Sequence, residues 1–252
     1  MQPHPLLAVK NLVTEFHTKD KIIKAVNGVS FTLNRGETLG IVGESGTGKS
    51  VTSLSVMRLI PSPPGKIISG QINYHSKNVG IVDLLKLPEN EMRNFRGNEI
   101  AMIFQEPMTS LNPVYTCGEQ VIESILRHQK ISVKTARQKT IRLFNEVQLP
   151  NPKTIFNSYP HQISGGQRQR VMIAMAISCN PVILIADEPT TALDVTVEHT
   201  ILKLLQKLQK ERNMSIIFIT HDLGVIAQLA DRVIVMYKGR IAEEGNTWKI
   251  FA

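Results

Sequence analysis

A glycine-rich segment of eight residues places the strongest constraint on how this chain can fold. Residues 43–50 read Gly-Glu-Ser-Gly-Thr-Gly-Lys-Ser, which matches the phosphate-binding pattern G-x-x-x-x-G-K-[ST]. The segment follows an apolar run at 38–42 and precedes a helical pattern, the context that such a loop requires. Glycines let consecutive backbone N–H groups turn toward a polyphosphate, and the following helix adds its positive end. We therefore expect an α/β protein that binds phosphate where a strand ends.

Two side chains of this loop predict how the phosphates are held. Lys49 places a cation against the β- and γ-phosphates of a nucleotide, and the Ser50 hydroxyl is expected to ligate the Mg²⁺ that bridges them. The predicted nucleotide-binding residues of the segment are Gly43, Glu44, Ser45, Gly46, Thr47, Gly48, Lys49, Ser50 and Val51.

A pair of carboxylates follows a second apolar run. Residues 182–188 read Val-Ile-Leu-Ile-Ala-Asp-Glu, so a buried strand is expected to end at Asp187. Open α/β sheets bind ligands at the carboxyl ends of their strands. Asp187 is therefore expected to hold Mg²⁺, directly or through water, and Glu188 to polarise an attacking water. A charged helix cap is the alternative for this pair taken alone, and the phosphate loop upstream favours the catalytic interpretation.

A third motif, Ser164-Gly165-Gly166-Gln167, opens a predicted helix that carries Arg168 and Arg170. Ser164 is a plausible N-cap, and the glycines let backbone amides approach an anion. The motif has the form of a second phosphate-binding helix start. It does not easily serve the nucleotide at Lys49, because that phosphate site is already complete. A plain glycine-rich helix start is the alternative for the motif by itself.

Strands and helices alternate along the chain, which favours an α/β core with a parallel sheet. Strands are predicted at 6–13, 25–33, 38–42, 67–74, 99–104, 182–186, 215–220, 232–237 and 240–243. Helices are predicted over about 51–60, twice within 117–149, and at 164–175, 194–212 and 223–230. Residues 112–157 are helical between two β-rich parts. We therefore expect one domain of 1–252 with a helical subdomain inserted at about 112–180.

Composition narrows the function classes. The 29 Lys and Arg against 21 Asp and Glu give a net charge of +8, which suits nucleic acid, an anionic membrane or a nucleotide, although a solvated surface is the simplest explanation. Aromatic residues are only 5%, which disfavours a stacking-based binder of single-stranded nucleic acid. Two cysteines are too few for a disulfide framework or a metal cage, and a reducing cytosol fits best. The sequence has neither a secretory signal nor a run that could cross a bilayer.

In this order the motifs resemble those of the ATP-binding subunits of ABC transporters, and the resemblance covers nearly the whole chain. The signature-like segment has Ile163 where the family usually has Leu. The resemblance implies a P-loop NTPase core with a parallel sheet, an antiparallel β subdomain and an inserted helical subdomain. It also implies that the nucleotide is ATP, bound with Mg²⁺ and hydrolysed.

Further residues gain a role only through the resemblance. Phe16 resembles the aromatic that stacks on adenine, and Gln105 resembles the glutamine that senses the γ-phosphate, the metal and the membrane partner. Residues 192–194, Ala-Leu-Asp, resemble the dimer-contact loop, and His221 resembles the switch histidine. The implied catalytic residues are Glu188, His221, Gln105 and Lys49, and the implied metal ligands are Ser50, Gln105 and Asp187. The implied nucleotide contacts outside the phosphate loop are Phe16, Ser164, Gly165, Gly166, Gln167 and Asp194.

Three longer segments, 36–46, 102–113 and 159–166, resemble the dipeptide, oligopeptide and nickel import branch, which is bacterial. This branch implies transmembrane permease subunits, a second ATP-binding subunit that is identical or paralogous, and indirectly an extracytoplasmic solute-binding protein. It implies a peripheral position on the cytoplasmic face of the cell membrane and no nucleic-acid partner. Members commonly continue with a proline- and cysteine-containing tail, whereas this chain stops at Phe251-Ala252, so we expect the tail to be missing.

Two other functions compete with a transport ATPase. A soluble ABC-type ATPase acting on nucleic acid or ribosomes would use the positive charge, but the import-branch wording around Gln105 argues against it. A regulatory cassette without catalysis would lack the base or the switch residue, and both Glu188 and His221 are present. The solute, peptide or nickel, stays open because the membrane subunits and the external binding protein select it.

Overall fold

The computed structural model describes residues 4–105, 110–191 and 193–251, and the chain divides into two compact units. The first unit comprises Met1–Arg93 with Asn213–Ala252, and the second comprises Asn94–Arg212. None of the helices in the described ranges is long and apolar enough to cross a membrane.

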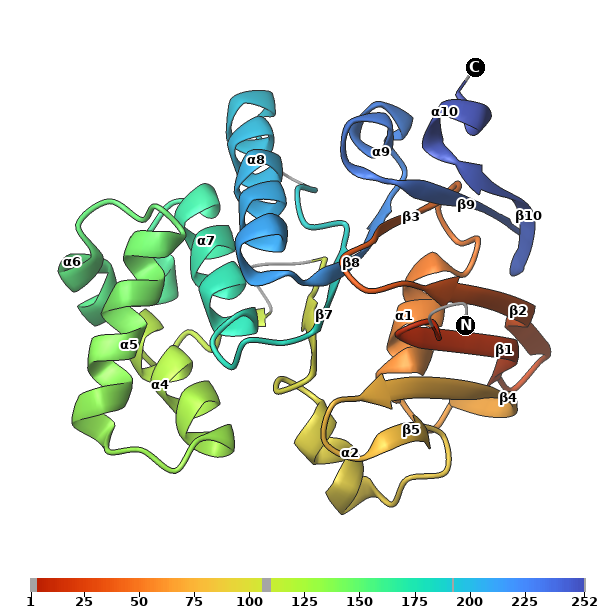
Figure 1. Ribbon diagram of the computed structural model, residues 1–252, viewed down its shortest axis with the longest axis horizontal. Helices are drawn as coiled ribbons and strands as arrows, with labels where there is room; N and C mark the ends of the chain where they lie inside the picture. Colours follow the sequence, from red (N-terminus) through yellow and green to blue (C-terminus); the bar gives the residue numbers. More distant parts are fainter. Residues whose placement is uncertain (1–3, 106–109, 192, 252) are drawn as a thin grey trace. The chain divides into compact units, whose positions relative to one another are not determined.

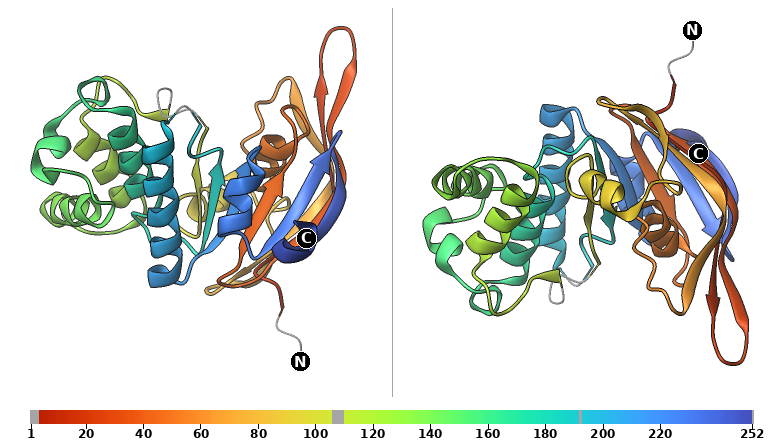
Figure 2. Two further views of the ribbon diagram at one scale, coloured as in Figure 1. Left: turned by 90° about the horizontal axis from the view of Figure 1, so that it is seen from above. Right: turned by 90° about the horizontal axis from the view of Figure 1, so that it is seen from below.

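The first unit contains an antiparallel sheet with the strand order β2-β1-β4-β5 (Figure 1). Its strands are β1 (Leu7–His17), β2 (Ile22–Leu33), β4 (Gly65–Ser76) and β5 (Gly80–Asp83). Figure 2 shows the β1–β2 hairpin as a long two-stranded ribbon. β1 lies between β2 and β4, so it pairs along both edges, which explains how a strand with several polar residues extends as far as His17.

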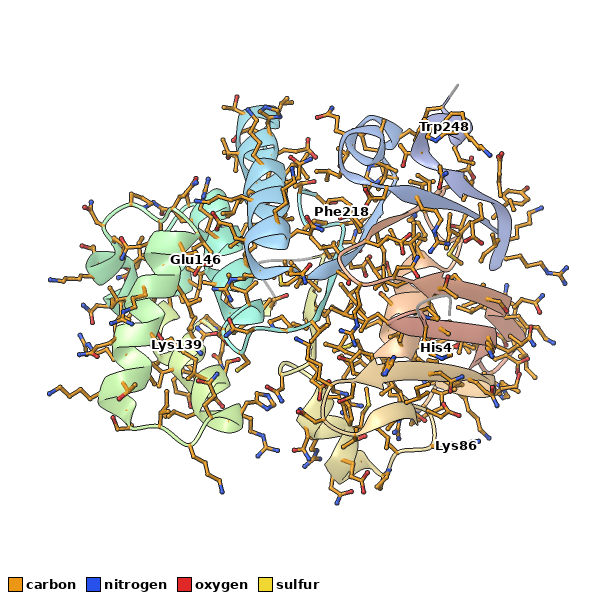
Figure 3. The ribbon with its side chains drawn as sticks, viewed as in Figure 1. His4, Lys86, Lys139, Glu146, Phe218 and Trp248 are labelled. Carbon is orange, nitrogen blue, oxygen red and sulfur yellow. The ribbon has the colours of Figure 1, made fainter. Side chains whose placement is uncertain are left out.

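A parallel group of strands forms the other part of the first unit. β3 (Thr38–Val42) lies between β8 (Ser215–Thr220) and β9 (Arg232–Tyr237), and β10 (Arg240–Asn246) adds an antiparallel edge. β3 and β8 are buried at every residue, as expected for parallel strands covered on both faces. The helices of this unit are α1 (Lys49–Val56), α2 (Glu89–Phe95), α9 (Leu223–Leu229) and α10 (Thr247–Ile250). In Figure 3, Phe218 belongs to the buried β8 and Trp248 to the exposed α10.

The second unit combines a parallel strand pair with a group of helices. β6 (Ile100–Ile103) pairs with β7 (Ile183–Asp187). The helices are α4 (Cys117–His128), α5 (Val133–Glu146), α6 (Pro152–Asn157), the 3₁₀ turn η1 (Pro160–Gln162), α7 (Gly165–Ala176) and α8 (Val195–Arg212). α4, α5, α6 and α7 pack together, and the Arg212 guanidinium at the end of α8 donates to Glu146 at 2.7 and 2.8 Å.

The predicted α/β class with parallel and antiparallel strands is confirmed; the differences lie at element ends and in short elements that were not predicted. α1 ends at Val56, although its apolar spacing predicted a helix to about residue 60. Arg58 takes a left-handed φ of 51°, the Arg58 N–H bonds Ser55 O at 3.0 Å, and the Leu59 N–H bonds Leu54 O at 2.8 Å. These two bonds form a Schellman motif, which closes a helix whatever the apolar spacing beyond it.

Three further elements, β5, α2 and α6, were not predicted because polar or proline residues concealed them. β5 and α2 lie in the polar segment between the predicted strands at 67–74 and 99–104. α6 begins at Pro152, a residue expected to end helical structure. Proline is well tolerated as the first residue of a helix, where its missing N–H costs no hydrogen bond.

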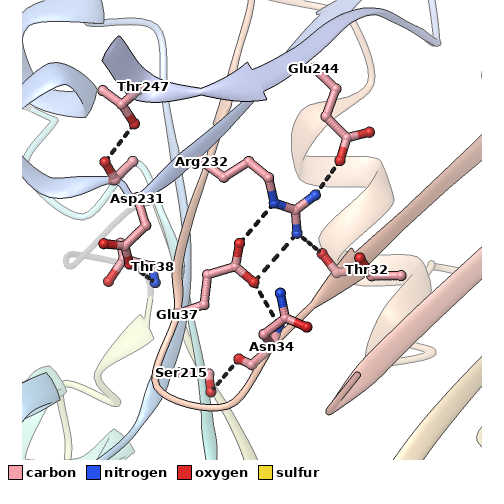
Figure 4. Close-up of polar contacts among 10 residues, drawn as sticks. Thr32, Asn34, Glu37, Thr38, Ser215, Asp231, Arg232, Glu244 and Thr247 are labelled. Carbon is pink, nitrogen blue, oxygen red and sulfur yellow. Dashed lines mark hydrogen bonds and ion pairs between the residues drawn. The ribbon is translucent and has the colours of Figure 1, made fainter. Parts of the chain in front are cut away.

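A half-buried arginine ties four segments of the first unit together (Figure 4). Arg232, the first residue of β9, donates from Nε to Glu37 Oε1 at 2.8 Å, and its other nitrogens contact Glu244 and Thr32 O. The Arg232 and Glu37 side chains are only 16% and 10% exposed. Burial alone lowers the pKa of Arg232, but the hydrogen bonds and charges of Glu37 and Glu244 raise it above its ordinary value. The guanidinium therefore stays charged, and each carboxylate depends on it.

We predict that Arg232→Met lowers the free energy of unfolding by about 2–3 kcal/mol, because it leaves partly buried carboxylates without their cation. Arg93→Met is the matched control, since Arg93 is 60% exposed and reaches Glu89 at only 3.7 Å. That variant should lose less than about 0.5 kcal/mol. Urea unfolding of both variants provides the measurement, and equal losses would mean that the Arg232 contacts contribute no more than a surface ion pair.

Candidate functional site

The predicted phosphate loop connects β3 to α1 within the first unit. The Lys49 ammonium donates to the Gly43 carbonyl at 2.7 Å and to the Glu44 carbonyl at 2.9 Å, so it lies inside the loop. Lys49 is buried and has no carboxylate in the first turn of its own helix. The loop therefore presents a buried cation together with a helix N-terminus, an arrangement that favours a bound anion.

His221 emerges at the same sheet edge as the phosphate loop. β3 and β8 are parallel neighbours with Val42 opposite Thr220, so their carboxyl ends lie side by side. His221 directly follows β8 and is exposed. Asp222 Oδ1 accepts from the N–H groups of Gly224 and Val225 at 2.7 and 3.2 Å, which caps α9 and fixes the backbone after the histidine.

Phe16 lies near the end of β1, on the sheet face that packs on α1. Side chains two residues apart on a strand share a face, and the Thr14 hydroxyl bonds the Ser55 hydroxyl of α1 at 2.8 Å. Phe16 is opposite Gly65 of β4, and it is half-buried. A partly exposed aromatic ring on this face can offer a stacking surface for a base.

The carboxylate pair and Gln105 come together in the second unit. β6 and β7 are parallel, with Ile103 opposite Ala186, so the residues that follow them share one edge. Asp187 is buried as the last residue of β7. Gln105 Nε2 donates to Glu188 Oε2 at 3.1 Å, and the Thr191 hydroxyl donates to the same oxygen at 2.9 Å.

The backbone of Glu188 is in a left-handed conformation, with φ of 46°. For a residue with a Cβ this conformation costs about 1–2 kcal/mol. The bonds from Gln105 and Thr191 help to hold the side chain that this backbone aims. Such local strain concentrates at functional sites, so the conformation favours a catalytic role for Glu188 over a simple helix cap.

The segment 164–167 forms the start of α7 in the second unit. Ser164 Oγ accepts from the Gln167 N–H at 3.3 Å and Gln167 Oε1 accepts from the Ser164 N–H at 2.9 Å, which together make a capping box. A Cβ at Gly166 would lie 2.8 Å from Val197 Cγ1, so this glycine allows α7 to approach the start of α8 closely. Asp194 caps α8 by accepting from the Val197 N–H at 2.9 Å.

The predicted residues divide between the two units. Phe16, the phosphate loop from Gly43 to Val51, and His221 belong to the first unit; Gln105, Asp187, Glu188, the segment 164–167 and Asp194 belong to the second. Ala192 and the residues 106–109 lie outside the described residues. Thr191 was not predicted, although a hydroxyl three residues after Glu188 is a signal that could have identified it.

The predicted metal ligands are oxygen donors of the kind that Mg²⁺ prefers: the Ser50 hydroxyl, the Asp187 carboxylate and the Gln105 amide oxygen. Within the described ranges there is no cluster of three or more His, Cys, Asp or Glu side chains that could hold a metal by itself. This donor set fits Mg²⁺, because that ion usually takes few protein ligands and completes its shell with water and substrate phosphates.

The chain is similar to a known protein family and to curated proteins of that family. The family described as ABC transporter matches residues 26–191. The chain is 54% identical to the oligopeptide transport ATP-binding protein OppD of Bacillus subtilis (strain 168) over 246 residues, which cover 98% of this chain and 67% of OppD. It is 52% identical to the glutathione import ATP-binding protein GsiA of Escherichia coli (strain K12), again over 98% of this chain, and spans only 40% of that relative.

Solved structures with the same fold include a dimeric post-hydrolysis state of the ATP-binding cassette MJ0796 bound to ADP and Pi. It superposes with a TM-score of 0.83 at 29% identity, over 96% of this chain and 98% of that one. CbiO1 from Clostridium perfringens, part of the ABC transporter complex cbiONQ, gives a TM-score of 0.79 at 26% identity, over 99% and 91% of the two chains.

The two serine caps of the second unit provide a matched test of the segment 164–167. Ser132 caps α5 by accepting from the Thr135 N–H at 3.2 Å, much as Ser164 caps α7. Each change to Ala should cost about 1 kcal/mol of stability by urea unfolding. Only Ser164→Ala should also lower the ATP hydrolysis rate, because only that hydroxyl is expected to contact a phosphate. Equal, unchanged rates in both variants would leave Ser164 with the capping role alone.

Proposed function

The chain belongs to the ABC transporter family, and on this premise we propose that it is the ATP-binding and ATP-hydrolysing subunit of a bacterial importer of peptides. The observation that carries the proposal is the 54% identity to OppD over 98% of the chain. OppD is named for oligopeptide transport and GsiA for glutathione import, which supports transport over an ATPase that acts on nucleic acid or ribosomes. Nickel is the other solute that the import-branch resemblance leaves open.

ATP binding is assigned to the first unit. The phosphate loop wraps the β- and γ-phosphates with backbone N–H groups, and Lys49 exchanges its carbonyl partners for phosphate oxygens. Phe16 stacks on the adenine. Ser50, Asp187 and Gln105 are the residues that would hold Mg²⁺, which would supply positive charge to neutralise the phosphates.

Hydrolysis is assigned to Glu188. Its carboxylate accepts a proton from the attacking water, and the bonds from Gln105 and Thr191 to Oε2 orient it for that task. Gln105 therefore links the carboxylate to the segment that leads toward α4. His221 is the second polar group expected at the γ-phosphate, where it positions rather than replaces the base.

The segment 164–167 is assigned to the ATP of a second cassette. Lys49 and its loop already provide a complete phosphate site, so the N-terminus of α7 is available to a nucleotide held by another subunit. Two ATP molecules then lie across a two-fold or pseudo-two-fold interface, with Asp194 near the contact. The dimeric state of the MJ0796 cassette supports this arrangement.

The membrane partners are proposed on the same basis. Permease subunits would receive the ATP-driven closure, an extracytoplasmic solute-binding protein would deliver the solute, and the chain would lie on the cytoplasmic face of the membrane. Val114 and Tyr115, which are 70% and 52% exposed just before α4, are candidates for the permease contact. Their position between Gln105 and the helices suits a segment that transmits a change at the γ-phosphate.

The nucleotide site is tested by Lys49→Ala. Removing the buried cation should weaken Mg-ATP binding at least tenfold, since the phosphates lose their charge partner. Titration with a fluorescent ATP analogue measures the affinity, and Lys203→Ala, on the outer surface of α8, serves as the control for a lost positive charge. An unchanged affinity for Lys49→Ala would remove the loop as the nucleotide site.

The catalytic and dimer assignments are tested together by Glu188→Gln. This change should preserve ATP binding but slow hydrolysis by about 10²–10⁴-fold, the usual contribution of a general base. Light scattering of the variant with ATP should then detect a dimer, alone or with a paralogous cassette, that is absent without nucleotide. Near wild-type hydrolysis would transfer the base role to another group, with His221 the next candidate. Turnover by a wild-type protein that stays monomeric with every partner would contradict the shared site.

A further inference from the structure

Three backbone segments of the first unit contact one another: a bulge in β2, the end of the phosphate loop, and the turn between β9 and β10. The Gly239 N–H in the β9–β10 turn donates to the Thr47 carbonyl of the loop at 3.0 Å. The Gly239 carbonyl in turn accepts from the Asn27 N–H of β2 at 2.8 Å. Gly239, which is far from both segments in sequence, therefore connects β2 to the phosphate loop through its backbone N–H and C=O groups.

The turn has the geometry that this contact needs. Tyr237 pairs with Arg240, and the two residues between them, Lys238 and Gly239, have φ of 47° and 76°. Two positive φ values in a two-residue hairpin loop define a type I′ turn, in which glycine is favoured at the second position. The turn thus holds the Gly239 N–H in one fixed direction, toward Thr47.

The contact also requires that Gly239 has no side chain. A Cβ there would lie 2.8 Å from Ala25 O and 3.2 Å from Lys24 O, both backbone atoms of β2. Ala25 is one of the β2 residues that the register with β1 skips, between Thr14–Val26 and Glu15–Lys24, and this bulge brings its carbonyl toward the loop. A Cβ at Gly48 would overlap the same carbonyl. The bulge, the loop and the turn therefore fit together only as bare backbone.

Holding the Thr47 carbonyl determines where the next N–H points. In a planar trans peptide the C=O of one residue and the N–H of the next point in opposite directions. When the Thr47 carbonyl faces Gly239, the Gly48 N–H faces away from the turn. The ordered direction of this N–H is what an anion-binding loop needs before its ligand arrives, because ordering the loop on binding would weaken the affinity.

We propose that Gly239 is a positioning residue for ATP binding: the β9–β10 turn holds the phosphate loop in its phosphate-binding conformation through the Gly239–Thr47 hydrogen bond. The inference rests on the proposed function, since it assumes that the loop binds ATP. It also makes the link reciprocal, so bound nucleotide stabilises the turn.

The test compares two glycines in the full-length chain. Gly239→Ala adds a Cβ that meets the backbone of β2, whereas Gly80→Ala adds one at the first residue of β5, where φ is 75° and none of the described atoms lies within 4 Å. Both variants suffer the same backbone strain, so strain alone cannot separate them. Gly239→Ala should weaken binding of a fluorescent ATP analogue about tenfold and raise the KM for ATP with a smaller change in kcat. Gly80→Ala should bind like the wild type.

Gly239→Asn and Gly80→Asn refine the comparison, because asparagine tolerates a left-handed φ and leaves only the crowding at Gly239. Gly239→Asn should also weaken binding. Wild-type affinity in both Gly239 variants, or an equal loss in the Gly80 variants, would overturn the proposal. If the Gly239 variants fail to fold, hydrogen exchange of wild-type residues 237–240 decides. Slower exchange with the analogue supports the proposal, and unchanged exchange contradicts it.

Lys49→Ala separates this inference from the function on which it rests. Loss of binding in Lys49→Ala with wild-type affinity in Gly239→Ala would leave the ATP site standing and remove only the positioning role. Absence of binding by the wild-type protein would remove both.

Discussion

The parallel pairing of β3 with β8 on one side and β9 on the other is the constraint on which the first unit depends. All five residues of β3 are buried, so its peptide groups must find partners in neighbouring strands rather than in water. Because the three strands are parallel, their carboxyl ends lie along the same edge of the sheet. The phosphate loop follows β3, His221 follows β8, and the turn of Lys238 and Gly239 follows β9. Burial of one short strand therefore brings together three segments that lie far apart in sequence, from Gly43 to Gly239.

The sequence predicts elements well where burial alone decides them. The bounds of β8 and β9 were predicted as observed, since each is an apolar run between turn residues. β1 was predicted to end at Val13 but continues through Thr14–His17, whose polar residues conceal a strand. Its pairing with both β2 and β4 supplies the stabilisation, and such pairing is a property of the tertiary fold. The end of α1 at Val56 is likewise set by local hydrogen bonds around Arg58, which periodicity does not reveal.

At the candidate site, too, the sequence predicts some features and misses others. Residue types with a known chemistry, such as Lys49, Asp187 and Glu188, can be identified from sequence because their side chains carry the chemistry. The left-handed backbone of Glu188 cannot, since glutamate does not ordinarily adopt it. The link between Gly239 and Thr47 cannot either, because a bond between two peptide groups leaves no side-chain pattern. What sequence misses at this site is therefore the backbone geometry that aims the recognised side chains.

The contacts that hold the two groups of residues differ in kind, and this difference suits their roles. The Thr47 carbonyl accepts a hydrogen bond from the backbone N–H of Gly239, whose own position is set by buried strands and a turn. Moving the Thr47 carbonyl would therefore disturb β2 and β9 as well. Glu188 is held by side-chain hydrogen bonds from Thr191 and from the exposed Gln105, and a bond of that type contributes only about 1 kcal/mol. Rearranging the bond costs little, while rearranging the loop costs much. A nucleotide-dependent change is therefore expected to begin within the second unit, at the contact of Gln105 with Glu188, while the phosphate loop keeps its conformation within the first unit.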